Sequence, residues 1–289
     1  MLRAARAAPT LLRDARPGVI EFLHAQFNAD GGVRDRAGAS DLYYTVFAVD
    51  ALCALEAEVP VELLTRYLRT FGDGAELDLV HLACLARCWS AVEGGTLDRA
   101  AASCILQRIE THRSGDGGYA RKPHAVTGAV YDCFLGLGAY QDLGTVPPDG
   151  AALGRCVLSL QTADGAFGSE HTPKLGTTPT TAAAIVLLHE LGVAVPQTAA
   201  DWLLARARPD GGFAATPVSP LPDLLSTGTA VHALATVDRP LAELKEPCLD
   251  FLDSLWTGRA FRGHWADEFA DCEYTFYALL ALGHLGADL

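Results

Sequence analysis

Asp164-Gly165-Ala166-Phe167 is one of five copies of a turn that recurs through this chain. Each copy follows one apolar, helix-like stretch and precedes another. The other copies are Asp30-Gly31-Gly32, Gly72-Asp73-Gly74, Asp116-Gly117-Gly118 and Asp210-Gly211-Gly212-Phe213, with a degenerate sixth at Phe261-Arg262-Gly263-His264-Trp265. Successive turn aspartates are 43, 43, 48 and 46 residues apart, a period typical of helical repeat architectures.

Each repeat divides into two kinds of helix. The segments before the turns, such as 60–70 and 196–208, are amphipathic and predict outer helices with one solvated face. The segments after the turns are apolar all round, which predicts buried inner helices. The first and last of these, 44–55 and 274–285, are as apolar as the others, whereas an open solenoid needs polar ends. We therefore predict an all-α fold, a closed (α/α)6 toroid of six outer and six inner helices.

Composition narrows the function classes. The 289 residues are 50% apolar with a net charge of -13, which argues against a nucleic-acid partner. No apolar run approaches the length of a membrane span. We expect residues 17–289 to form one domain, and residues 1–16, which lack a secretory apolar core, to be a disordered or amphipathic leader. Most of the eight cysteines lie in apolar helical runs, which predicts reduced core thiols in a cytoplasmic protein.

The repeated turn and its flanking helices resemble the prenyltransferase and squalene-cyclase repeat. Over roughly residues 17–289 the chain is similar to a single toroid of the terpenoid-cyclase and protein-prenyltransferase β-subunit superfamily. The resemblance implies a central cavity that encloses an isoprenoid or polyene substrate.

Acidic residues recur at one position of the predicted inner helices. The six helices align on Thr45, Leu82, Thr127, Thr181, Thr227 and Thr275. In four of them an aspartate stands four residues before the aligned position: Asp41, Asp78, Asp223 and Asp271. His81 lies on the same helical face as Asp78, which allows an acid–base pair. These five are the candidate catalytic residues at the cavity rim. Aspartate is also among the best helix N-caps, which is the structural interpretation of the same pattern.

Other residues near these helix starts predict the wall of a substrate site. The candidates are Tyr44, Phe47, Cys84, His124, Trp265, Tyr274 and Tyr277. Their aromatic faces can stabilise a positive charge. Five residues after the aligned positions stand Asp50, Arg87 and Asp132, which we interpret as a buried ion-pair ladder between neighbouring helices because buried charges have to be paired.

The metal chemistry that the resemblance implies is only partly present. In the protein prenyltransferases an Asp, a Cys and a His bind zinc, and the matching positions here are Asp223, Leu225 and Tyr274, so zinc is disfavoured. The Asp-x-Asp-Asp acid motif of class II terpene cyclases does not occur. If the chain binds a metal, the sequence points to Mg²⁺ at Asp267, Glu268 and Asp271, whose spacing resembles that of class I isoprenoid enzymes.

Three functions follow as hypotheses. The first is a terpenoid-cyclase-like or prenyltransferase-like enzyme of specialised metabolism, acting by acid-initiated cyclisation or prenyl transfer. The second is a ligand- or peptide-binding toroid that has lost its zinc site. The third is a β-like subunit of a hetero-oligomeric prenyltransferase. The polar outer helices favour a monomer or homodimer over that third hypothesis.

Overall fold

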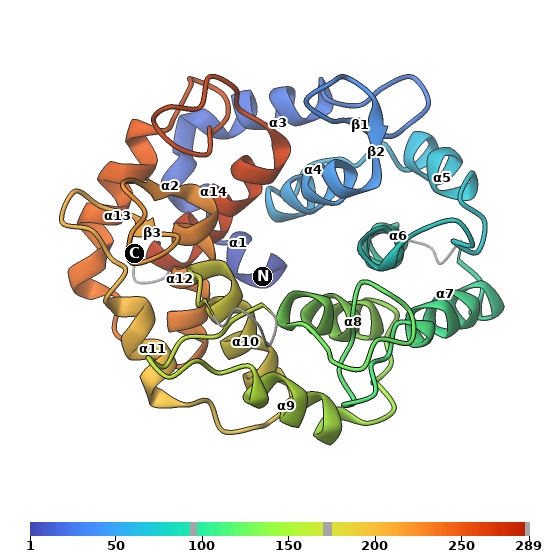
Figure 1. Ribbon diagram of the computed structural model, residues 1–289. Helices are drawn as coiled ribbons and strands as arrows, with labels where there is room; N and C mark the ends of the chain where they lie inside the picture. Colours follow the sequence, from blue (N-terminus) through green and yellow to red (C-terminus); the bar gives the residue numbers. More distant parts are fainter. Residues whose placement is uncertain (93–96, 170–174, 287–289) are drawn as a thin grey trace.

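The computed structural model describes residues 1–92, 97–169 and 175–286, and it confirms the (α/α)6 toroid (Figure 1). The inner helices are α4 (Leu42–Ala54), α6 (Leu79–Ala91), α8 (Val130–Asp142), α10 (Thr178–Glu190), α12 (Leu224–Thr236) and α14 (Cys272–Leu285). The outer helices are α3 (Arg16–His24), α5 (Val61–Arg69), α7 (Arg99–Thr111), α9 (Gly150–Ser159), α11 (Gln197–Leu204) and α13 (Ala242–Ser254). Each inner helix packs against its two neighbours, and α14 packs against α4, so the ring is closed.

Each glycine-rich turn connects an outer helix to the inner helix that follows it, and several of these turns pack against the next outer helix along the ring. Gly211 has φ +89°, a conformation that favours glycine, and a Cβ there would lie 2.1 Å from the carbonyl oxygen of Pro247 in α13. In the same way, a Cβ on Gly31 would lie 2.0 Å from the carbonyl oxygen of Leu63 in α5. Two turns continue into short antiparallel ribbons, β1 (Val33–Arg34) with β2 (Ser40–Asp41) and β3 (Phe213–Ala214) with β4 (Pro222–Asp223). Val33 lies opposite Asp41 and Phe213 opposite Asp223, so the ribbons end at inner-helix N-caps.

One side chain on most inner helices fastens the helix to its turn. The amide of the apolar residue that ends the turn donates to this side chain: Val33 to Thr45 (2.9 Å), Tyr119 to Cys133 (3.2 Å), Phe167 to Thr181 (3.0 Å), Phe213 to Thr227 (2.9 Å) and Phe261 to Thr275 (3.3 Å). The position therefore faces the outer ring. The sixth turn therefore lies just before Phe261, at Gly258 (φ +96°), and not at 261–265 as predicted.

The third repeat corrects the predicted register. We expected Thr127 to take the aligned position, but Thr127 lies in the loop before α8, and the Cys133 thiol makes the contact. The shift is six residues, because the loop of this repeat is longer than we assumed. Three other repeats show the same spacing, since their threonine follows the turn phenylalanine by 14 residues, as Cys133 follows Tyr119.

The leader is helical rather than disordered. It forms α1 (Leu2–Ala5), α2 (Pro9–Leu12) and the 3-10 turn η1 (Arg13–Ala15), with Ala5 and Ala8 fully buried. In Figure 1, α1 lies inside the ring, and it packs against α14 and α4. A Cβ on Gly283 would lie 2.0 Å from the Ala4 carbonyl oxygen, so this glycine allows the close approach. Within the described ranges, no helix is long and apolar enough to cross a membrane.

Candidate functional site

The cavity inside the ring is lined by one face of every inner helix. The side chain that holds the turn stands four residues after the N-cap and points outward. An α-helix turns by about 100° per residue, so residues two, six and nine positions after the cap point the opposite way. These residues line the cavity. From the sequence we placed the cavity on the cap and on positions three, six and seven; position six lies on the face that lines it, whereas the cap and positions three and seven lie roughly a third of a turn away.

The lining forms three layers from the helix N-termini downward. The top layer comprises Tyr43, Tyr131, Pro179, Leu225 and Glu273. The middle layer comprises Phe47, Cys84, Leu135, Ala183, Thr229 and Tyr277. The basal layer comprises Asp50, Arg87, Gly138, Val186 and His232. The cavity has a larger lobe of about 420 Å³ and a smaller one of about 90 Å³, which share Met1, Tyr43, Tyr131, Phe134 and Tyr277 in their walls.

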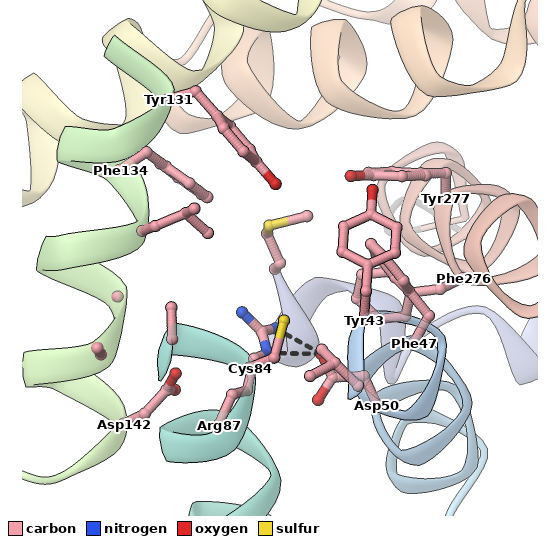
Figure 2. Close-up of a pocket in the computed structure, with 16 residues that line it drawn as sticks. Tyr43, Phe47, Asp50, Cys84, Arg87, Tyr131, Phe134, Asp142, Phe276 and Tyr277 are labelled. Carbon is pink, nitrogen blue, oxygen red and sulfur yellow. Dashed lines mark hydrogen bonds and ion pairs between the residues drawn. The ribbon is translucent and has the colours of Figure 1, made fainter. Parts of the chain in front are cut away.

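Aromatic rings form one side of this cavity. Phe47 packs against Tyr43 at 4.9 Å, Tyr277 at 5.5 Å and Phe276 at 5.9 Å between ring centroids. In Figure 2, Tyr43, Tyr131 and Tyr277 project their hydroxyls into the open space between the helices. Ring faces and phenol edges of this kind suit an apolar ligand that carries or develops positive charge.

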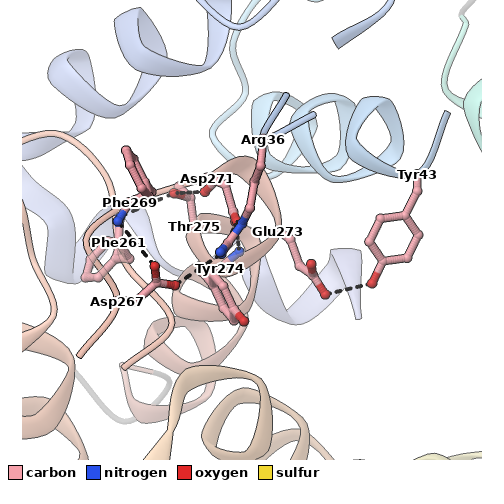
Figure 3. Close-up of polar contacts among 9 residues, drawn as sticks. All are labelled: Arg36, Tyr43, Phe261, Asp267, Phe269, Asp271, Glu273, Tyr274 and Thr275. Atoms are coloured by element: carbon pink, nitrogen blue, oxygen red, sulfur yellow. Dashed lines mark hydrogen bonds and ion pairs between the residues drawn. The ribbon is translucent and has the colours of Figure 1, made fainter. Parts of the chain in front are cut away.

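Glu273 is the carboxyl group of the top layer, and it is not among the residues predicted from the sequence. It lies near the start of α14, and its Oε1 accepts a hydrogen bond of 2.7 Å from the Tyr43 hydroxyl (Figure 3). Burial raises the pKa of Glu273 above its usual value; the Tyr43 hydrogen bond opposes this rise, and the nearby Asp271 charge adds to it. A larger fraction of Glu273 therefore holds its proton near neutral pH than is the case for an exposed glutamic acid.

The basal layer contains an ion pair, but not the ladder that we predicted. Arg87 donates from Nε and Nη2 to Asp50 Oδ2, both at 2.7 Å. Asp132, the expected third member, instead lies 3.7 Å from Arg121, because the register shift moves it to the start of α8. The second acid near Arg87 is Asp142, the last residue of α8 (Figure 2).

Two histidines meet at the opposite end from Glu273. His232 Nδ1 lies 2.8 Å from His284 Nε2, and His232 lines the larger lobe. Burial holds the pKa of both imidazoles below the usual value, that of His284 at about 4. Both rings are therefore neutral at pH 7.

The four rim aspartates cap their helices. Asp41, Asp78, Asp223 and Asp271 each accept a backbone amide hydrogen bond in the first turn of α4, α6, α12 and α14. The ring of His81 lies between two of them, 2.7 Å from Asp78 and 3.6 Å from Asp41. None of these five candidates lines either lobe of the cavity. They lie at the N-terminal ends of the inner helices, and a catalytic role for them stays a prediction.

Three of the seven predicted substrate-binding residues line the cavity, and the other four lie outside it. Phe47, Cys84 and Tyr277 line the cavity as expected. Tyr44 and Tyr274 stay at the rim near Arg36, whose guanidinium lies 5.6 Å from the Tyr274 ring centre. His124 is exposed in the loop before α8. Trp265 packs on Phe251 of α13 and donates to Ser254, so it belongs to the outer ring.

The predicted metal ligands do not fit a cation. Arg36 lies between two of them, with Nη2 3.1 Å from Asp267 and 2.9 Å from Asp271 (Figure 3), while Glu268 is exposed. The Arg36 guanidinium occupies the position where a metal cation would be held. The zinc position fits no better, since the two Asp223 oxygens accept from the amide and hydroxyl of Ser226. Among the described residues, no group of three or more His, Cys, Asp or Glu side chains is arranged to hold a metal.

Asp142 gives a prediction about stability. Burial raises its pKa from 3.8 to about 6, although Arg87 opposes the rise. The folded protein therefore holds an extra proton between these values, and stability falls as pH rises through the window from about 4 to 6. We expect Asp142→Asn to raise the free energy of unfolding at pH 7.5 by roughly 1–3 kcal/mol, with little effect at pH 4. Urea unfolding at both pH values measures this.

The matched control is Glu246→Gln, on the exposed face of α13. It removes one negative charge away from the cavity and should leave the pH dependence unchanged. An equal gain from both variants would show that net charge, and not Asp142, limits stability.

Comparison with known proteins places the chain in a family. A model of the prenyltransferase α/α-toroid domain matches residues 12–215 and again 181–289. No curated protein matches. The chain belongs to the prenyltransferase α/α-toroid family.

Solved structures with the same fold have diverse activities. A type II terpene cyclase from Scytonema, in complex with merosterolic acid A, is 18% identical, with 96% of this chain and 97% of that chain covered and a TM-score of 0.66. Candida albicans protein geranylgeranyltransferase-I, complexed with GGPP, is 13% identical, with 91% and 89% covered and a TM-score of 0.68. An α-1,6-mannanase of Salegentibacter is 12% identical, with 94% and 98% covered and a TM-score of 0.66. At these identities the likeness shows the fold alone.

Proposed function

We propose that this protein is a terpenoid-cyclase-like enzyme that encloses a small neutral polyene and starts its cyclisation by proton transfer from Glu273. The observation that carries the proposal is a carboxylic acid of raised pKa within an apolar, partly aromatic cavity. The isoprenoid ligands of two structural relatives support the substrate class. The mannanase shows that the fold also serves sugars, but a largely apolar cavity suits a hydrocarbon better.

The proposed step conserves atoms and charge. The Glu273 proton adds to the less substituted carbon of the terminal alkene, the electrons of the broken π bond form the new C–H bond, and the positive charge is left on the carbon that bears three carbon substituents. The resulting tertiary carbocation is attacked by the next alkene of the folded chain, which closes a ring. The Glu273 carboxylate that remains keeps its hydrogen bond from Tyr43. Tyr277 and Phe47 lie one helical turn below and face the cationic carbons.

The charges of the cavity favour protonation over loss of a diphosphate. Among the described residues of its wall, the cationic side chain is Arg87, which Asp50 already binds through two nitrogens, and the other cationic group is the α-ammonium of Met1, whose pKa burial lowers. A departing diphosphate needs several cations or metal ions to stabilise its charge. An alkene needs only the proton, so prenyl transfer is the weaker form of the proposal.

Incubation with uncharged polyprenyl compounds in D₂O tests this function. We expect farnesol or geranylgeraniol to give a cyclic product that carries one deuterium from solvent, because the Glu273 proton exchanges with water. Gas chromatography with mass spectrometry detects this product. Diphosphate release from geranylgeranyl diphosphate would instead support prenyl transfer. Ligand-induced thermal stabilisation without any product would support a binding protein.

A further inference from the structure

The acid and the histidine pair lie at opposite ends of one space. Glu273 and His232 both line the larger lobe, the first in its top layer and the second in its basal layer. Seven residues of helix separate the two layers, which is roughly 10 Å at 1.5 Å per residue. A bound polyene that reaches Glu273 with one end therefore reaches His232 with its interior or its other end.

The hydrogen bond between the two imidazoles determines what His232 can do. When His232 Nδ1–H donates to His284 Nε2, over the observed 2.8 Å, the Nε2 lone pair of His232 is left free. His284 lies in α14 behind His232 and does not line the cavity, so it orients the ring. Burial keeps His232 unprotonated at neutral pH. Its low basicity is sufficient, since a carbocation is a far stronger acid than an imidazolium.

We propose that His232 is the base that ends the reaction, with His284 as its positioning residue. The inference rests on the proposed cyclisation. The Nε2 lone pair of His232 takes a proton from a carbon next to the final carbocation, and the C–H electrons become the new C=C bond. The imidazolium passes this proton to solvent, and Glu273 regains one from solvent. The product is thus an isomer of the substrate.

The side chains between the two ends support this division of roles. Tyr277 and Thr229 of the middle layer lie between Glu273 and His232, on the same two helices. The Tyr277 ring can stabilise a carbocation in the middle of the cavity. The Thr229 hydroxyl is too weak a base to remove a proton efficiently. His232 is the basic side chain that the described wall of this lobe presents below the acid; Met1, whose buried α-amino group lies near His232, also lines this wall.

Product analysis of His232→Asn tests the proposal, with farnesol or geranylgeraniol as the substrate. Asparagine keeps a polar group beside His284 but is not a base. We expect substrate consumption to fall less than about tenfold, because initiation is intact, while the main wild-type alkene loses roughly tenfold or more of its share. Alkenes with a shifted double bond and water-quenched alcohols should replace it. The double variant His232→Leu/His284→Leu repeats the test without leaving a buried imidazole unpaired.

The outcomes separate the inference from the function on which it rests. An unchanged product pattern in both variants overturns His232 as the base, while the cyclase function stands. Complete loss of consumption by folded variants also overturns it, because the histidine would then act in initiation. If the wild type cyclises neither alcohol, both proposals fall. His189→Asn, an exposed histidine of α10, should match the wild type.

Discussion

Glu273→Gln is expected to lower kcat for cyclisation by about 10³-fold, which equals about 4 kcal/mol of transition-state stabilisation. Glutamine has the size and hydrogen-bonding capacity of glutamic acid, but it has no acidic proton to give. Binding of the substrate should change little, since the cavity keeps its shape and Tyr43 can still donate to the amide oxygen. Single-turnover kinetics and a thermal-shift titration with the same alcohol measure the two effects separately.

The matched control is Glu268→Gln, which makes the same chemical change five residues earlier on an exposed loop. It should keep kcat within about twofold, because only a group that reaches the substrate takes part in proton transfer. If Glu273→Gln retains full activity, the acid lies elsewhere, and the rim candidates Asp41, Asp78, Asp223 and Asp271 return as alternatives.

The pH profile gives an independent readout of the same acid. Activity requires protonated Glu273, so it should be highest at low pH and fall as pH rises through the pKa of Glu273. Because burial raises that pKa, the fall comes at higher pH than for an ordinary glutamic acid. Tyr43→Phe removes a hydrogen bond that lowers the pKa, so the fall should move to still higher pH. A shift toward lower pH would contradict this assignment.

Arg87→Leu is expected to have the largest effect on stability. It leaves Asp50, which is 4% exposed, without its partner, and breaking a buried pair in this way costs about 3–5 kcal/mol. That is a large fraction of the stability of an ordinary domain. In the wild type, the positive charge of Arg87 opposes the effect of burial on the pKa of Asp50. Removing Arg87 therefore raises the pKa of Asp50 further. The variant should therefore recover stability as pH falls and Asp50 becomes protonated.

Two further variants separate pairing from mere loss of a side chain. Asp50→Leu/Arg87→Leu removes both charges and should be roughly as stable as the wild type, or more so. Arg239→Leu breaks the exposed pair with Asp201 and should cost less than about 1 kcal/mol. Urea unfolding at pH 7 compares all three. A double variant as unstable as Arg87→Leu would show that packing of the arginine, and not its charge, is what matters.

The sequence predicted the arrangement of helices better than the direction of their side chains. The turn glycines and the apolar segments after them recur with a regular period, and this pattern depends only on local physics: positive φ at the turns and burial of every apolar face. Phe47, Cys84 and Tyr277 were correctly placed in the cavity because their helices were recognised. Arg36 shows the limit, since its ion pairs with Asp267 and Asp271 join residues more than 200 positions apart.

By itself the sequence determined the closed ring of six helical hairpins, because each turn and each amphipathic or apolar helix follows from neighbouring residues. Only the tertiary structure decided which face of each helix meets the cavity. The inner helices are apolar all round, so hydrophobicity carries no preferred direction, and the outward contact of Thr45 and its equivalents with the turn amides sets the rotation. That rotation brings Glu273 and His232 into one space and leaves the rim aspartates as helix caps.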